Sequence, residues 1–277
     1  MGQREAGMMP TSGAQGVGKT YQNMYIIKDY VRDKFASKVR GRKCLIFDTN
    51  GEYTQDQFAA NDIPNFPVKR MRVRDVKAWC RSNVVECRRI DAKNLGIKEK
   101  KQILEYILKV FRNGLLVLED INTYLLNVTH MEEIVGKLVN LRHKACDILI
   151  SYQSLRAIEP RIWANSRYMR VHYQSEDVDD IKDKVTNPEL FKIAQLLINQ
   201  KYYDGDHRFF VYVHLLAHKV EGKFTKEEFE EACRKYLRLR SGKKKVKEYK
   251  DVHECSDQEA IRGQTEFFIK QYYGNAA

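Results

Sequence analysis

The sequence lacks the features that mark membrane-spanning or secreted proteins. No apolar run approaches the roughly 18 residues that a membrane-spanning helix needs, and the mean hydropathy is −0.58. The amino-terminal segment MGQREAGMMP has no apolar core of the kind found in signal peptides. We therefore expect a protein with no membrane span that works in the cytoplasm of a cell.

The cysteine and histidine patterns give no disulfide framework and no metal centre. Six cysteines are present, but they form no CxxC pair and lack the close, regular spacing of a disulfide scaffold. Cys44 and Cys146 lie in apolar, strand-like runs, where we expect buried, reduced thiols. His214 and His218 are four residues apart in a strand-like run, where that spacing does not make the helical face used by metal-binding pairs.

The chain also lacks internal repeats, and instead alternates strand and helix patterns. Apolar or β-branched runs predict strands over 43–49, 83–90, 114–121, 146–152, 167–173 and 208–216. Between and after them, helical periodicity covers 20–37, 98–113, 131–145, 188–201 and 223–240. The strands over 115–118 and 148–150 are almost wholly apolar, which is typical of strands covered on both faces. This pattern predicts an α/β fold with a mainly parallel central sheet flanked by helices.

Acidic residues are in the minority. The 277 residues include 49 Lys+Arg against 37 Asp+Glu, a net charge of +12. Such a surplus favours nucleic acid, an anionic membrane surface or an acidic partner, and does not choose among them.

The strongest motif is GAQGVGKT at residues 13–20, which matches the P-loop pattern G-x-x-x-x-G-K-[ST]. Glycines allow the backbone N–H groups to point at phosphate oxygens, and the following helix adds its positive end. The Lys19 ammonium would reach the terminal phosphates of ATP, and the Thr20 hydroxyl would bind Mg²⁺. The expected nucleotide-binding residues are Gly13, Ala14, Gln15, Gly16, Val17, Gly18, Lys19, Thr20 and Tyr21.

A second motif follows about a hundred residues later, where four aliphatic residues run into two acids, Glu119 and Asp120. This is the form of a Walker B strand, in which one acid holds the hydration shell of Mg²⁺ and another orients the attacking water. We assign Glu119 to the metal and Asp120 to the water by position. Related ATPases mostly carry Asp before Glu, so the reversed order leaves the two roles open.

The strand over 146–152 is followed by Gln153. In a parallel sheet the carboxyl ends of adjacent strands open onto the bound phosphates. An amide at this point is therefore a candidate sensor of phosphate loss.

Taken in order, GAQGVGKT, IFDTNGEY (46–53), LLVLEDI (115–121) and LRHKACDILISYQS (141–154) resemble the FtsK–HerA superfamily of hexameric P-loop DNA translocases. Asp48, Gly51, Glu52 and Tyr53 match the DxxGEY signature of the HerA branch. The resemblance covers roughly residues 6–216 and implies a RecA-like ATPase core. In its short length the chain looks most like the compact genome-packaging ATPases of viruses.

The resemblance implies a homo-oligomeric ring, with a hexamer expected, whose active sites lie between subunits. Arg142 matches the position of a finger arginine that acts on the neighbouring subunit's site, with Arg156, Arg161 and Arg167 as rivals. Double-stranded DNA would be held through its phosphates, independently of sequence. The candidate DNA contacts are residues 68–77, the loop 122–130 that contains Tyr124, and Lys243–Lys245.

These patterns divide the chain into an ATPase core over 1–218 and a basic helical extension over 219–277. We expect a hairpin-like turn at Asp204-Gly205-Asp206, a helix capped by Thr225 and Glu228, and a flexible Lys-rich tail from Ser241. The last segment is compatible with either a helix or a strand.

The sequence thus predicts an ATP-driven translocase of double-stranded DNA, with packaging of a viral genome into a preformed capsid as its task. Capsid vertex proteins would be its partners, and the host cytoplasm or the virion its location. Two alternatives stay open: a HerA-like translocase or helicase in DNA processing or conjugation, and an assembly ATPase like those of filamentous phages.

Overall fold

The computed structural model describes residues 6–33, 39–125 and 128–275, and these form two compact units. The first unit comprises the described residues of 1–11, 18–153 and 157–166, and the second those of 12–17, 154–156 and 167–277. The predicted boundary at residues 218 and 219 stays a prediction.

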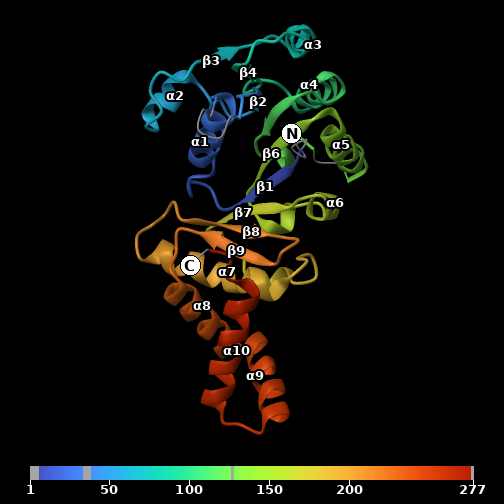
Figure 1. Cartoon of the computed structure of the whole chain (residues 1–277). Helices are drawn as coiled ribbons and strands as arrows, with labels where there is room; N and C mark the ends of the chain where they lie inside the picture. Colours follow the sequence, from blue (N-terminus) through green and yellow to red (C-terminus); the bar gives the residue numbers. More distant parts are fainter. Residues whose placement is uncertain (1–5, 34–38, 126–127, 276–277) are drawn as a thin grey trace. The chain divides into compact units, whose positions relative to one another are not determined.

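The first unit is built on parallel strands (Figure 1). Its strands are β1 (Met8–Ser12), β2 (Lys43–Asp48), β3 (Val68–Arg70), β4 (Cys87–Asp91), β5 (Gly114–Leu118) and β6 (Cys146–Tyr152). They lie in the order β3-β4-β2-β5-β6-β1, and the β3–β4, β4–β2, β2–β5 and β5–β6 ladders are parallel. This topology confirms the predicted α/β fold with a mainly parallel sheet of RecA-like type.

Helices cover both faces of this sheet. They are α1 (Lys19–Val31), α2 (Gln55–Ala60), α3 (Val76–Arg81), α4 (Ile97–Val110), α5 (Val128–Leu141) and α6 (Pro160–Ala164). Met24 and Ile27 of α1 pack against Ile46 of β2 and Val117 of β5. Because side chains alternate along a strand, the neighbouring residues Phe47 and Leu118 face the other side, and they are fully buried as well. Figure 1 shows α4 and α5 on that other side of the sheet.

The register of the ladders brings three strand ends together. Phe47 of β2 is paired with Leu118 of β5, and Leu118 is paired with Ile150 of β6. The segments that follow β2, β5 and β6 therefore emerge at one edge of the sheet. These are the segments that carry the predicted chemistry.

In the part of the chain that the structure describes, the second unit contains three antiparallel strands and four long helices (Figure 1). Its elements are β7 (Tyr168–His172), α7 (Pro188–Tyr203), β8 (Phe210–His214), β9 (Lys219–Gly222), α8 (Lys226–Arg238), α9 (Arg240–His253) and α10 (Asp257–Tyr272). β8 pairs antiparallel with both β7 and β9. Figure 1 shows α9 and α10 side by side.

Two sequence predictions in this unit are wrong. The segment Asp204-Gly205-Asp206 is not a hairpin turn, because helix α7 runs on to Tyr203 and the turn joins it to β8. The stretch after Ser241 is not a flexible tail, since it forms helix α9. Gly242 makes that helix possible, because a Cβ there would lie only 2.2 Å from the Tyr236 carbonyl oxygen.

Two other local predictions, the cap of α8 and the burial of two cysteines, are confirmed. The Thr225 and Glu228 capping box starts α8, with the Thr225 N–H donating to Glu228 Oε2 over 2.9 Å. Cys44 and Cys146 are fully buried. Among the described residues, no helix has both the length and the apolar character needed to cross a membrane.

Candidate active site

The P-loop motif joins β1 to α1, in the strand, turn and helix order that the motif requires. Gly16 and Gly18 have φ angles of 82° and 84°, a region that residues with a Cβ rarely adopt. Helix α1 begins at Lys19, and its amino end has neither a side-chain cap nor an acidic residue in the first turn. Its first backbone N–H groups therefore suit an anion such as phosphate.

Asp48, the first residue of the DxxGEY signature, holds the rest of the signature in a turn. Its buried carboxylate accepts hydrogen bonds from the N–H groups of Gly51 and Glu52, at 2.8 and 3.1 Å, and from that of Tyr53 at 3.2 Å. Arg89 Nη1 pairs with the same carboxylate over 2.7 Å. The signature is thus a rigid turn that aims Glu52 and Tyr53 in fixed directions.

The turn directs Glu52 toward the P-loop. The Thr20 hydroxyl donates to Glu52 Oε2 over 2.8 Å. A hydroxyl and a carboxylate at this spacing supply oxygen ligands, which Mg²⁺ prefers. The donor set therefore fits Mg²⁺, and it includes Glu52, which the sequence did not mark as a site residue.

Tyr53 points instead into a buried network around Glu119, the residue that follows β5. The Tyr53 hydroxyl donates to Glu119 Oε1. Asn23 of α1 donates from Nδ2 to the same oxygen over 2.7 Å and also contacts Ser151 Oγ at 3.1 Å. The network therefore links the P-loop helix, the turn after β2 and the ends of β5 and β6.

Burial is the main electrostatic influence on Glu119, whose side chain is almost fully enclosed. Loss of solvent raises the pKa of Glu119 to about 7, and the hydrogen bonds from Tyr53 and Asn23 oppose that rise. A carboxyl with a pKa near neutrality exchanges its proton readily in the physiological range.

Asp120 lies in a different environment from Glu119. It is partly exposed, and its φ angle of 42° is uncommon for a residue with a side chain. Its Oδ2 accepts from Asn50 Nδ2 at 3.3 Å and from Gln153 Nε2 at 3.4 Å. The structure thus brings the predicted sensor Gln153 to the second Walker B acid.

Arg142 is not near these residues. It is exposed in a short 3₁₀ segment before β6, whereas Gln153 follows the other end of that strand. Within one chain it therefore lies at the opposite end of β6 from Gln153 and the acids. Its rival Arg156 is paired with Glu176 over 2.7 Å.

The side chains predicted to contact DNA differ in their burial and in their ion pairs. Tyr124 is buried and packs edge-on against Phe47, so its side chain is not available to contact DNA. Residues 126–127 of its loop lie outside the described residues. In 68–77, Lys69 pairs with Glu86 and Arg70 with Asp91, which offsets part of that segment's charge. Lys244 and Lys245 are on α9, 3.8 and 3.4 Å from Glu248 and Glu189 respectively.

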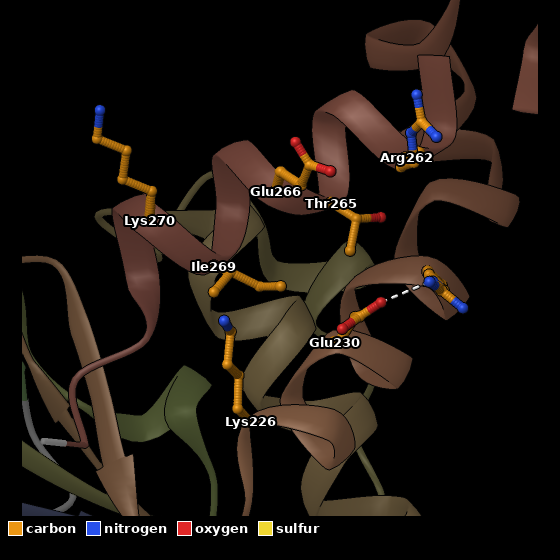
Figure 2. A pocket seen from close by; sticks show the side chains of 8 residues that line it. Lys226, Glu230, Arg262, Thr265, Glu266, Ile269 and Lys270 are labelled. Atoms are coloured by element: carbon orange, nitrogen blue, oxygen red, sulfur yellow. Dashed lines mark hydrogen bonds and ion pairs between the residues drawn. The ribbon is translucent and has the colours of Figure 1, made fainter. Parts of the chain in front are cut away.

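A separate groove of about 560 Å³ lies between α8 and α10 in the second unit. Figure 2 shows Lys226 and Glu230 on one wall, facing Glu266 and Ile269 on the other. None of the predicted site residues lines it.

Sequence reasoning missed Asn23 and Ser151. Asn23 stands four residues after Lys19 in a helix, where a polar residue carries no motif signal, and Ser151 stands inside an apolar strand. The one available signal was a polar residue inside an otherwise buried pattern, since such groups need hydrogen-bond partners.

No family model and no curated protein matches the chain. Among solved structures, it is similar to the genome packaging NTPase B204 of Sulfolobus turreted icosahedral virus 2 in complex with ATP-γS. The identity is 13%, the match covers 79% of this chain and 97% of that chain, and the TM-score is 0.46.

Two further solved structures are similar. One is B204, the DNA-packaging ATPase of Sulfolobus turreted icosahedral virus, at 12% identity, covering 78% of this chain and 95% of that chain with a TM-score of 0.49. The other is the N-terminal domain of zonular occludens toxin from Neisseria meningitidis, at 14% identity, 60% and 76% coverage, and a TM-score of 0.33.

Proposed function

We propose that this protein hydrolyses ATP and uses the energy to translocate double-stranded DNA, with genome packaging into a preformed capsid as its task. The observation that carries the proposal is the link between the P-loop helix and the Walker B acid, Asn23 Nδ2 to Glu119 Oε1 at 2.7 Å. The ordered motifs that resemble FtsK–HerA translocases support the DNA track and the ring.

The residues of the site have separable tasks in this proposal. Bound Mg²⁺ would offset the negative charge of the phosphates. Thr20 and Glu52 would hold the ion, and Glu119 would hold its hydration shell from the buried side. Lys19 would bind the terminal phosphates, and the amino end of α1 would add its N–H groups.

Asp120 is the better placed acid for the attacking water. It is partly exposed at the strand end, whereas Glu119 is enclosed by protein donors. The amides of Asn50 and Gln153 fix its carboxylate. This carboxylate would accept the proton of the water as the water oxygen bonds to the γ-phosphorus and the bond from that phosphorus to the departing oxygen of ADP breaks. Gln153 would move with Asp120 when the phosphate leaves.

DNA would be bound by cations spread over the ring. By the resemblance, Arg142 would act on the site of a neighbouring subunit, and its exposed position away from the acids of its own chain supports this role. The same resemblance supports a hexamer and capsid vertex proteins as partners.

The test is ATP hydrolysis by the purified protein with and without long double-stranded DNA. We expect hydrolysis to need Mg²⁺, to rise with DNA at low salt and to lose that rise as salt increases. Lys19→Ala should abolish hydrolysis. Turnover that is independent of Lys19, or that never responds to DNA, would contradict the proposal.

A further inference from the structure

Strand β4 lies beside β2 and brings a buried arginine next to the Asp48 carboxylate. Asp48 and Asp91 are direct partners across the parallel β2–β4 ladder. Arg89 stands two residues before Asp91, so its side chain leaves the strand on the same face. Two carboxylates that face each other across a ladder repel. This point of the sheet therefore needs a cation.

The Arg89 guanidinium supplies that cation and contacts both carboxylates. Its Nη1 lies 2.7 Å from Asp48 Oδ2, and its Nη2 lies 3.4 Å from Asp91 Oδ2. From the neighbouring strand β3, Arg70 Nη2 contacts the same Asp91 oxygen at 2.8 Å. The Arg89 side chain is only 8% exposed and that of Asp48 is fully buried. Burying the Asp48 charge without a partner would be costly, and the Arg89 charge offsets that cost.

Asp48 connects Arg89 to the turn that follows β2. Its Oδ1 accepts hydrogen bonds from the N–H groups of Gly51 and Glu52, at 2.8 and 3.1 Å. Gly51 has a φ angle of 79°, and a Cβ there would lie 2.9 Å from Cδ of Lys93. The turn is therefore closely packed as well as hydrogen-bonded. The position of the Glu52 backbone depends on the Asp48 carboxylate.

The Glu52 side chain extends from this turn to the start of α1, where the Thr20 hydroxyl donates to its Oε2 over 2.8 Å. These two residues supply the oxygen donors that suit Mg²⁺. An arginine has no acceptor atom and cannot itself bind a cation. Any effect of Arg89 on the ion would therefore act through Asp48 and Glu52.

We propose that Arg89 is a positioning residue for Mg²⁺: by neutralising the buried Asp48 carboxylate, it holds the turn that places Glu52 against Thr20. This inference rests on the proposed function, since it needs a nucleotide with Mg²⁺ at the site. Groups that support a metal ligand commonly change metal affinity by about 10–100-fold. Arg89 lies outside the DxxGEY signature, and no motif in the sequence marks it.

The test measures how much Mg²⁺ strengthens nucleotide binding by the full chain. Titration calorimetry with a non-hydrolysable ATP analogue is carried out once with Mg²⁺ and once with a chelator, and the ratio of the two affinities is the Mg²⁺ effect. Arg89→Met keeps most of the side-chain length and removes the charge. It should reduce the Mg²⁺ effect by about tenfold and change the affinity in chelator little.

Arg89→Lys is the conservative variant. It keeps the charge, but a compact ammonium cannot contact two carboxylates with a planar fork. We expect it to retain only part of the Mg²⁺ effect. Thermal melts check that each variant is folded, and if Arg89→Met does not fold, Arg89→Lys decides.

A double-mutant cycle distinguishes positioning from general support of the fold. Glu52→Gln removes the charge of the metal ligand and should itself reduce the Mg²⁺ effect. If Arg89 acts through Glu52, adding Arg89→Met to Glu52→Gln should cause little further loss. Two losses that multiply would show that Arg89 does not act through Glu52, and would overturn the proposal.

The matched control is Arg88, the preceding residue of β4. It is also an arginine in an ion pair, but it pairs with Glu86 and packs over the Trp79 ring at 5.6 Å. Arg88→Met should leave the Mg²⁺ effect unchanged. An equal loss in Arg88→Met and Arg89→Met would overturn the proposal, because it would show a general effect of charge on β4.

The remaining outcomes separate this proposal from the proposed function. An unchanged Mg²⁺ effect in folded Arg89→Met, or in the deciding Arg89→Lys, would overturn the positioning role. Analogue binding that Mg²⁺ does not strengthen in the unmodified protein would overturn it as well. Failure of the unmodified protein to bind the analogue, or equal binding by Lys19→Ala, would contradict the proposed function itself.

Discussion

Asn23 Nδ2 lies 2.7 Å from Glu119 Oε1, and so joins the helix that follows the P-loop to the strand end that carries the acids. The same amide reaches the Tyr53 hydroxyl at 3.1 Å. One side chain thus connects three motifs that are far apart in the sequence. A shift of α1 would therefore move the hydrogen-bond donor of the Glu119 carboxylate.

Removing that amide should therefore uncouple binding from hydrolysis. Asn23→Leu has a similar volume but no donor, and we expect kcat for ATP hydrolysis to fall by at least tenfold while ATP affinity changes little. The buried partners lose a hydrogen bond, which costs about 1–3 kcal/mol of stability. Steady-state kinetics and urea unfolding measure the two effects.

Asn61 provides the control, because it lies at the surface just after α2, where its side-chain amide donates to the Gln57 carbonyl oxygen over 2.7 Å. Asn61→Leu should hydrolyse ATP at the normal rate. Equal kinetics for Asn23→Leu and Asn61→Leu would show that the network around Glu119 has no part in turnover.

The stability of the metal-free protein should depend on pH through Glu119. Burial raises the pKa of Glu119 from 4.5 to about 7 in the folded chain. Between these values the folded state holds a proton that the unfolded chain has lost, so the free energy of unfolding falls as pH rises through this range. The full effect is on the order of 3 kcal/mol.

Glu119→Gln keeps the hydrogen-bond acceptor and removes the titration. Its stability advantage over the unmodified protein should be absent near pH 4.5, grow toward pH 7 and then level off. Urea unfolding across this range, with a chelator present, measures it. Parallel pH profiles for the two proteins would show that Glu119 is not the buried acid described.

Arg142 and Lys19 should complement each other in mixed assemblies. If Arg142 serves a neighbouring site, then Arg142→Ala and Lys19→Ala subunits are each inactive alone, but a mixture forms some complete sites. We expect partial recovery of DNA-stimulated hydrolysis on mixing. Near-normal hydrolysis by Arg142→Ala alone would move the finger role to another arginine.

The Lys-rich helix α9 should contribute to DNA binding without sequence preference. Replacing Lys243, Lys244 and Lys245 with alanine should weaken binding equally for unrelated sequences and reduce its dependence on salt. The control replaces Lys98, Lys100 and Lys101 of α4 with alanine. Equal loss in the two triple variants would mean that general charge, rather than α9, accounts for the binding.

The strand ends of the site could be predicted from sequence because β5 and β6 are continuous apolar runs followed by polar residues. Because such strands are covered on both faces, they are apolar along their whole length, and the first polar residue after the run marks the end of the strand. Glu119, Asp120 and Gln153 were therefore found at their correct strand ends. The network partner Asn23 could not be found, because its role depends on contacts with residues 30 to 128 positions away.

The errors in the second unit have a related cause. The stretch after Ser241 is rich in lysine and has few apolar residues of its own, so nothing local predicts a helix. Gly242 and Val246 are buried because α9 packs against the neighbouring helices α8 and α10. Tertiary packing, and not intrinsic propensity, decides such a segment.

Movement along DNA driven by ATP is measured most directly by displacement of a third strand. A labelled oligonucleotide bound as a triplex near the end of a long duplex is released when a translocase passes. We expect release that needs ATP and Mg²⁺ and is absent with Lys19→Ala. Robust ATP hydrolysis with no release of the third strand would contradict ATP-driven movement along DNA.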